Sequence, residues 1–208
     1  MRTSDILNIW GKGQILAFSG VNGYTDFAEG LVLTTEESPS MKIRFPEDRG
    51  RIRFGTGKPE RCFVASDCFQ VNGTTGVFPD TYHLLLEGDV EFEDLSPSLT
   101  LLRKGGRSLL GNKEHFDPEW LTLDPSSELE RRLGFFAALP DFGVTEDSRR
   151  KALAKACSQL KGQIYSPYEN FPYHWTTPDR WPHKQMWLWD SVFHALGMRH
   201  CNPALARD

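Results

Sequence analysis

Hydrophobic and polar residues follow two different periods along this chain, and the period changes once. Short apolar runs recur in the first half, at 14–19, 30–35, 41–45, 51–54, 62–71, 82–93 and 99–103. In two of them, Ile43 with Phe45 and Ile52 with Phe54 alternate with basic residues, which is the period of a half-buried strand. We therefore predict a β-strand in each run.

Turn sequences separate these runs and indicate how the strands connect. Asn22-Gly23, Asn72-Gly73 and Gly105-Gly106 are pairs that tight hairpins favour. About seven short strands joined by such turns are typical of an antiparallel β-sandwich. We assign this sandwich to residues 1–115.

From about residue 116 the apolar positions are spaced as in helices. The run 125–139 begins with a serine cap and stops before Pro140, and 145–160 combines an acidic first turn with an apolar stripe. A third helix is predicted from near Pro182 or His183 to Arg199. The sequence thus predicts a multidomain α+β protein with a helical segment over 116–208.

The last residues, 202–208, have the pattern of a helix start. Asn202 is a capping residue, Pro203 suits the first helical position, and good helix formers follow. One turn of helix is not stable by itself. We therefore expect the helical segment to continue beyond Asp208.

Composition excludes several classes of function. The net charge of −4 is spread along the chain, without the basic block that would neutralise phosphates, so nucleic acid is not an expected partner. No apolar run approaches the roughly 20 residues of a membrane span, and the N-terminus lacks a signal peptide, so we expect a cytoplasmic protein without membrane contact.

The four cysteines lack metal-ligand spacing, and we expect neither metal nor cofactor. Oligomeric state is not indicated.

The segment 187–194 carries the candidate chemistry. Asp190 follows the indole of Trp189, and a carboxyl group beside apolar rings loses water, which favours its protonated form. Enzymes use such carboxylic acids as general acids. On a helix, Trp187, Asp190 and His194 share one side with Ser191. Trp189, Phe193 and Leu196 form an adjacent strip that we expect in the core.

The preceding loop is rich in aromatic residues. Four of the six tryptophans lie within 175–189, and Tyr173 and Trp175 lie among prolines. Such rings offer flat apolar faces that suit the C–H-rich face of a sugar. Arg180 could bind an anionic group through two parallel hydrogen bonds. The simpler alternative is that Asp190 is structural and pairs with the backbone or with His194.

The string 188–194, Leu-Trp-Asp-Ser-Val-Phe-His, resembles the L-W-D-x-x-F-H element of glycoside hydrolase family 63, and 181–187 is similar to bacterial members. That family includes processing α-glucosidase and mannosylglycerate hydrolases. The resemblance implies a β-sandwich followed by an (α/α)6 barrel, with Asp190 as the general acid. Trp189, Trp187, His194, Trp175, Tyr173 and Arg180 would then contact the carbohydrate substrate.

The same resemblance leaves one catalytic group unassigned. An inverting glycosidase of this family also needs a carboxylate base, and no position of this sequence corresponds to it. We therefore expect a truncated barrel, a fragment of an α-glucoside or glycosylglycerate hydrolase that is inactive alone. Two alternatives stay open: a non-catalytic carbohydrate-binding sandwich, and a structural or interaction module.

Overall fold

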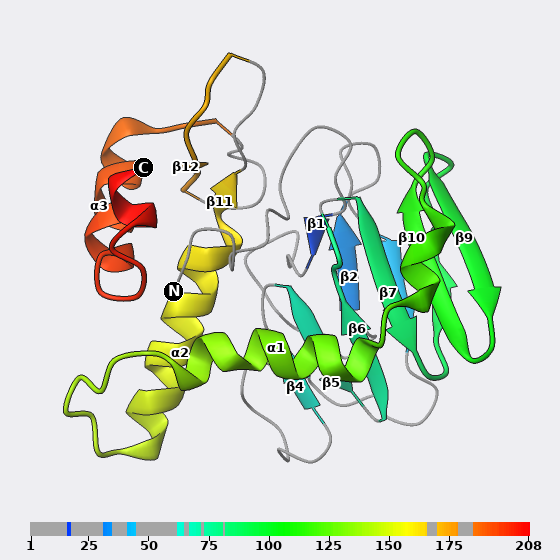
Figure 1. Cartoon of the computed structure of the whole chain (residues 1–208), viewed down its shortest axis with the longest axis horizontal. Helices are drawn as coiled ribbons and strands as arrows, with labels where there is room; N and C mark the ends of the chain where they lie inside the picture. The colour runs from blue at the N-terminus through cyan, green and yellow to red at the C-terminus, as the bar shows by residue number, and fades with distance from the viewer. Residues whose placement is uncertain are drawn as a thin grey trace.

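The computed structural model describes residues 16–17, 31–34, 41–44, 62–64, 67–71, 73–80, 82–165, 170–178 and 185–208. In this part of the chain, most strands come first and three α-helices follow (Figure 1). The fold is therefore mixed α+β, which confirms the order that the hydrophobic periods predict. Among the helices described, none is long and apolar enough to cross a bilayer.

The larger sheet has six strands, and all of its neighbours are antiparallel. Its order is β4 (Cys62–Val64), β5 (Cys68–Val71), β6 (Thr74–Val77), β7 (His83–Glu87), β10 (Arg107–Asn112) and β9 (Leu99–Lys104). Lys104 pairs with Arg107, so β9 and β10 are joined by the two-residue loop that the sequence predicts. Gly105 and Gly106 both have positive φ, at 60° and 77°, as such a loop requires.

A second antiparallel sheet has the order β1 (Leu16–Ala17), β2 (Leu31–Thr34), β3 (Met41–Arg44) and β8 (Glu91–Glu93). Ile43 on β3 is fully buried, as its alternation with basic residues predicts. A short pair, β11 (Ile164–Tyr165) and β12 (Trp175–Thr176), lies between the last two helices in sequence. The strand predicted at 51–54 lies outside the described residues.

Two of the predicted strands are each two strands in the structure. The run 62–71 reverses direction so that Val64 pairs with Phe69, and the run 82–93 divides into β7 and β8. Strands β6 and β10 were not predicted at all. A continuous apolar run does not reveal a reversal, and β10 is buried on both faces, so it lacks the alternation that marks a half-buried strand.

The first helix, α1 (Pro125–Ala137), begins two residues earlier than a cap at Ser126 would place it. Asp124 is the N-cap, and its side chain accepts a hydrogen bond from the Ser127 backbone N–H at 3.0 Å. The prediction of a serine cap is therefore wrong, because the aspartate before Pro125 is the residue whose extended backbone aims its carboxylate at the first turn. Helix α2 (Asp147–Gly162) begins after Glu146 without a side-chain cap.

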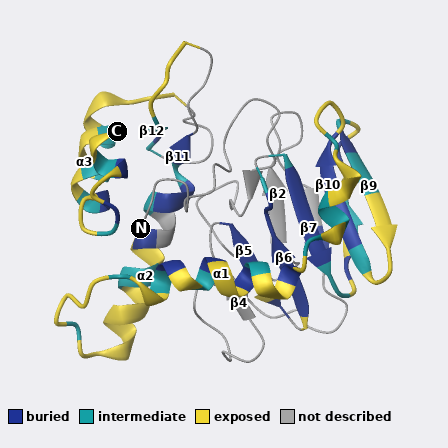
Figure 2. Ribbon diagram, viewed as in Figure 1, coloured by how far each residue is buried: buried dark blue, intermediate teal, exposed yellow. Residues whose placement is uncertain are grey.

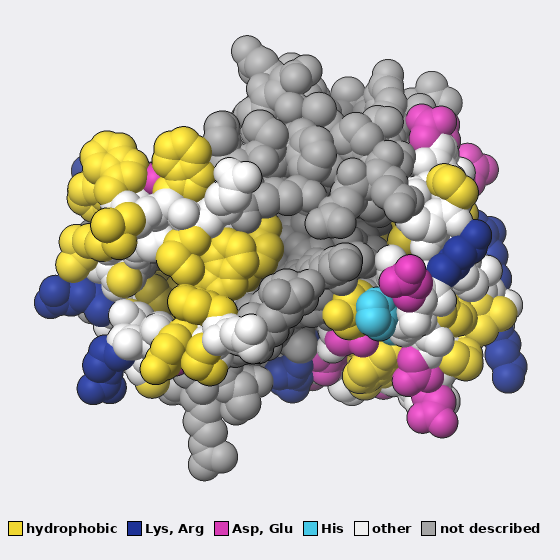
Figure 3. Space-filling view, turned by 90° about the horizontal axis from the view of Figure 1, so that it is seen from above, with side chains coloured by type: hydrophobic (Ala, Val, Ile, Leu, Met, Phe, Trp, Pro, Cys, Tyr) yellow, Lys and Arg dark blue, Asp and Glu magenta, His cyan; other side chains and the backbone are white. Residues whose placement is uncertain are grey.

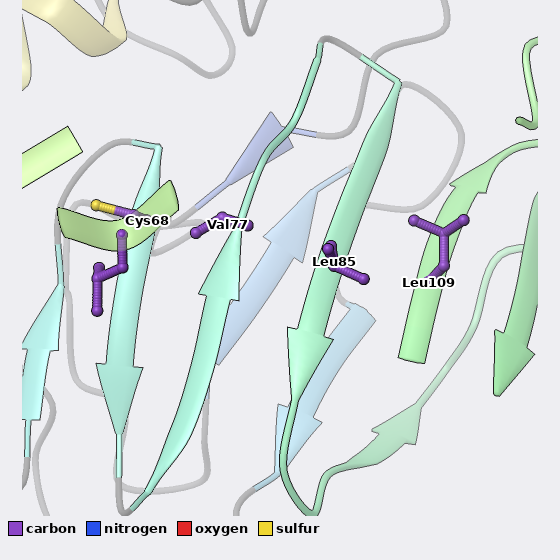
Figure 4. Close-up of a cluster of buried hydrophobic side chains, with 5 residues drawn as sticks. Cys68, Val77, Leu85 and Leu109 are labelled. Atoms are coloured by element: carbon purple, nitrogen blue, oxygen red, sulfur yellow. The ribbon is translucent and has the colours of Figure 1, made fainter. Parts of the chain in front are cut away.

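Helix α1 covers one face of the six-stranded sheet (Figure 1). Its Leu129 joins a buried cluster with one residue from each of four neighbouring strands: Cys68, Val77, Leu85 and Leu109 (Figure 4). On β7, Leu84 and Leu86 point to the opposite face and are also fully buried. The sheet is therefore covered on both sides around its centre.

A buried ion cluster joins the sheet to two helices. Asp67, directly before β5, accepts hydrogen bonds from Arg132 of α1 at 2.9 Å and from Lys161 of α2 at 2.6 Å. The three side chains are 1%, 1% and 3% exposed. Burial alone would raise the pKa of Asp67, but the charges of Lys161 and Arg132 outweigh it and lower that pKa to about 2.

We expect Asp67→Asn to lower the free energy of unfolding by about 3–5 kcal/mol, because it leaves buried Lys161 without its counter-charge and leaves Arg132 paired with Glu128 alone. Urea unfolding followed by circular dichroism measures the change. Glu146→Gln is the matched control, since the Glu146–Arg149 ion pair is largely exposed, and it should leave stability nearly unchanged. Equal effects of the two substitutions would contradict the structural role of the cluster.

Candidate functional site

Helix α3 (Leu188–Met198) carries the candidate acid, and its start is set by an extended residue. Trp187 is the N-cap with φ −108° and ψ 118°, and its carbonyl accepts from the Ser191 N–H at 2.9 Å. Residues 185–187 are not helical. The predicted start near Pro182 or His183 is therefore wrong, because the helical hydrogen bonds begin only at the Trp187 carbonyl.

One side of α3 packs on β12 and α2. The Ser191 hydroxyl donates to the Thr176 carbonyl at 3.3 Å, and His194 Nδ1 lies 2.9 Å from the Thr176 hydroxyl oxygen. At Gly197 an added Cβ would lie 2.9 Å from a methyl carbon of Leu160 on α2. The absence of a side chain at Gly197 therefore lets α2 approach α3 closely.

The other side of α3 is apolar and exposed (Figures 2 and 3). Trp189 is 68% exposed and Phe193 60%, and their rings meet edge to face at 5.5 Å. Leu196 is exposed as well. The expectation that this strip fills the core is therefore wrong. Helical spacing shows that these residues share a strip, but no described element packs over it.

Asp190 lies in the first turn of α3, between these two sides. Its side chain is half-buried, and it has no hydrogen-bond or ion-pair partner among the residues that the structure describes. Trp187, three positions before it, is 46% exposed. Of the two pairings that the structural alternative offers, the one with His194 is not formed as a hydrogen bond, and the His194 Nδ1 atom contacts the Thr176 hydroxyl instead.

The aromatic residues before α3 take two different positions. Trp175 on β12 stacks on Tyr165 of β11, with ring centroids 4.1 Å apart and planes at 23°. Tyr173 is exposed and meets Phe171 edge to face at 5.8 Å. Arg180 lies outside the described residues, so its predicted contact with an anionic group stays a prediction.

A mainly apolar cavity of about 310 Å³ lies between β12, α3 and the C-terminal turn. It brings two of the predicted site residues together, Trp175 and His194, whereas Tyr173, Trp187, Trp189 and Asp190 do not line it. The predicted residues therefore form two groups: a pair in the cavity wall, and Asp190 with two exposed indoles on the first turn of α3.

Contacts distant in sequence complete the cavity, and sequence reasoning missed them. Thr176 forms hydrogen bonds with both Ser191 and His194. Asp208 accepts hydrogen bonds from the backbone N–H and from the ring of His174. The ring contact with His174 lowers the pKa of Asp208. No local pattern could have indicated a contact between positions 34 apart.

The described residues contain no cluster of three or more His, Cys, Asp or Glu side chains that could hold a metal ion. No model of a known protein family matches this sequence, and no curated protein matches it either. Any functional argument for this chain therefore depends on its own residues and their geometry.

We expect the pKa of His194 to lie below its usual 6.5, because burial disfavours the imidazolium more than the charge of Asp190 favours it. The neutral ring then stabilises the fold above pH 6.5, and this contribution is lost as the pH falls through the lowered pKa. An NMR titration of the His194 ring measures it. Asp190→Asn should lower the pKa of His194 further, and an upward shift would contradict this placement of the two groups.

Proposed function

We propose that this chain is the acid-bearing portion of an inverting α-glycosidase of the glycoside hydrolase family 63 type, acting on an α-glucoside or a glycosylglycerate. The string Leu-Trp-Asp-Ser-Val-Phe-His at 188–194 supports the family, by resemblance. The order of antiparallel sheet and then helices agrees with the architecture that this family implies. The proposal makes the protein an enzyme whose partner is a carbohydrate.

The observation that carries the proposal is the setting of Asp190. A half-buried carboxylate without a hydrogen-bond or ion-pair partner among the described residues lies in the first turn of α3, one and three positions after the exposed indoles of Trp189 and Trp187. A core residue would instead be paired, because a polar group removed from water without a hydrogen bond is costly. Exposed rings beside a free carboxyl group are what a ligand needs: faces on which to stack and an acid to protonate it.

The finer architecture belongs to the same proposal. Two antiparallel sheets would pack as a β-sandwich over residues 1–115, which agrees with the complete burial of Leu84, Leu86 and Ile43. Helices α2 and α3 would be among the first helices of an (α/α)6 barrel within 116–208.

The proposed chemistry assigns one proton to Asp190. Its carboxyl group would protonate the glycosidic oxygen as the bond to the anomeric carbon breaks, while a water molecule attacks that carbon from the opposite face. A second carboxylate, roughly 6.5–9.5 Å away in inverting enzymes, would take the proton of the water. No residue of this sequence is assigned to that second role.

The alternative of a carbohydrate-binding sandwich expects exposed aromatic rings on the sheets. In the part of the chain that the structure describes, every large exposed aromatic side chain lies at or after Phe142, beyond both main sheets. The aromatic surface is therefore on the helical side, around α3, and this favours the glycosidase.

We expect the purified chain 1–208 to bind an α-glucoside, an α-mannoside or a glycosylglycerate, as measured by isothermal titration calorimetry. Trp189→Ala should weaken binding roughly tenfold, because a lost stacking contact is worth about 1.4 kcal/mol. Leu196→Ala is the matched control, since Leu196 is an exposed apolar residue farther along the same helix. Absence of binding, or equal losses in the two variants, would contradict the proposal.

We expect Asp190→Asn to lower kcat by roughly 10²–10⁴-fold in a form of the protein that hydrolyses α-glycosides, because the leaving group then receives no proton. Substrates with activated leaving groups should be spared, since they need little protonation. The chain 1–208 should show no turnover with either kind of substrate. Turnover by this chain that Asp190→Asn abolishes would mean that it also contains the base.

A further inference from the structure

Two cysteines distant in sequence lie with their thiols in contact. The Sγ atoms of Cys157 and Cys201 are 3.2 Å apart, although the residues are separated by 44 positions. Cys157 lies on α2 and is buried, and Cys201 lies in the turn after α3 and is half-buried. The pair therefore connects the two helices that meet at Gly197.

We propose that Cys157 and Cys201 form a thiol–disulfide exchange site that reacts with low-molecular-weight disulfides of the glutathione type. The two sulfur atoms need to approach by only about 1.2 Å to reach the bond length of a disulfide. This inference is independent of the proposed function, because it involves neither Asp190 nor a sugar.

The two thiols differ in ways that assign their roles. The contact with the Cys157 thiol lowers the pKa of Cys201, because it stabilises the thiolate. The same contact raises the pKa of Cys157, and burial raises it further. Cys201 is also the more accessible of the two. Cys201 is therefore the attacking residue and Cys157 the resolving one.

The exchange proceeds in two balanced steps. In the first, the Cys201 thiolate attacks one sulfur of the small disulfide, forms a mixed disulfide and releases one small thiolate. In the second, Cys157 gives its proton to that thiolate, and the Cys157 thiolate so formed attacks the Cys201 sulfur and displaces the second small thiolate, which takes back from water the proton that Cys201 had lost. The net reaction converts two protein thiols and one small disulfide into one protein disulfide and two small thiols, with two electrons passing to the small molecule.

A third described cysteine does not compete for this reaction. Cys68 is fully buried in the core of the six-stranded sheet, and burial raises the pKa of its thiol. A thiol that is neither accessible nor ionised does not react with a small disulfide. Among the described thiols, the site is therefore selective for the pair on α2 and after α3.

A disulfide bond between Cys157 and Cys201 would link two walls of the cavity covalently, the one formed by α2 and the one formed by α3. Leu160 on α2 and Met198 on α3 both line the cavity, and each lies three residues from a cysteine of the pair. In the reduced state these walls are held by apolar packing, in which Cys201 takes part. In the oxidised state a covalent bond would prevent α3 from separating from α2.

The test is incubation of the purified chain with oxidised glutathione, followed by intact-mass and peptide-mapping mass spectrometry under non-reducing conditions. We expect the chain to lose the mass of two hydrogens and to yield a Cys157–Cys201 cross-linked peptide. Cys157→Ser should stop at a glutathione adduct on Cys201. The double variant Cys62→Ser/Cys68→Ala is the control that retains the pair, and it should form the same cross-link.

The oxidised chain should also have a melting temperature roughly 5–15 °C higher than the reduced chain, because the bond closes a loop of more than 40 residues. Several outcomes would overturn the proposal. They are an unreacted pair, a stable glutathione adduct in the unsubstituted chain, or a cross-link to Cys62 or Cys68. Peptide mapping of the unsubstituted chain needs no variant. Its result therefore tests the proposal even if a substitution impairs folding.

Discussion

The charge cluster around Asp67 fixes how the helices sit on the sheet. Its carboxylate lies before β5, while its cationic partners come from α1 and α2, 65 and 94 positions later. A buried cation without its counter-charge is so costly that both helices are restricted to positions in which Arg132 and Lys161 reach the same oxygen. Arg132 also donates to the Phe78 carbonyl at 2.6 Å, which links α1 to the end of β6.

The placement of α3 depends on this frame through α2. Leu160, next to Lys161, lies against Gly197 of α3, and Ile164 joins Met198 in a small apolar cluster. The hydrogen bonds of Thr176 then fix the rotation of α3 about its axis, because they hold Ser191 and His194 inward. With that side turned inward, Asp190 lies at the boundary and the strip with Trp189 faces outward.

This arrangement relates the candidate acid to the rest of the chain. Asp190 is carried by a helix whose inner side is bonded to β12 and packed on α2, so the backbone at Asp190 has a defined position, while its carboxylate makes no hydrogen bond in the described structure. Fixed geometry and an unengaged acid are both requirements of general acid catalysis. The cysteine pair acts on the same contact between α2 and α3, at the far end of α3 from Asp190.

Features that depend on neighbours along the chain could be predicted from local patterns of residues. The change from strands to helices near residue 116, the Gly105-Gly106 hairpin and the buried side of β3 at Ile43 follow from local period and turn chemistry. The grouping of Ser191 and His194 on one side of α3 also follows from helical spacing. These predictions succeed because side-chain direction repeats with a fixed period in each kind of element.

The partners that each residue meets depend on the packing of distant segments and could not be predicted in this way. The reversal at Asp67, the strands β6 and β10 and the burial of Arg132 depend on contacts between distant segments, which no local pattern encodes. The strip of Trp189 and Phe193 shows the same limit, since its spacing equally suits a core and an exposed surface. Periodicity states which residues share a face, and packing decides what that face touches.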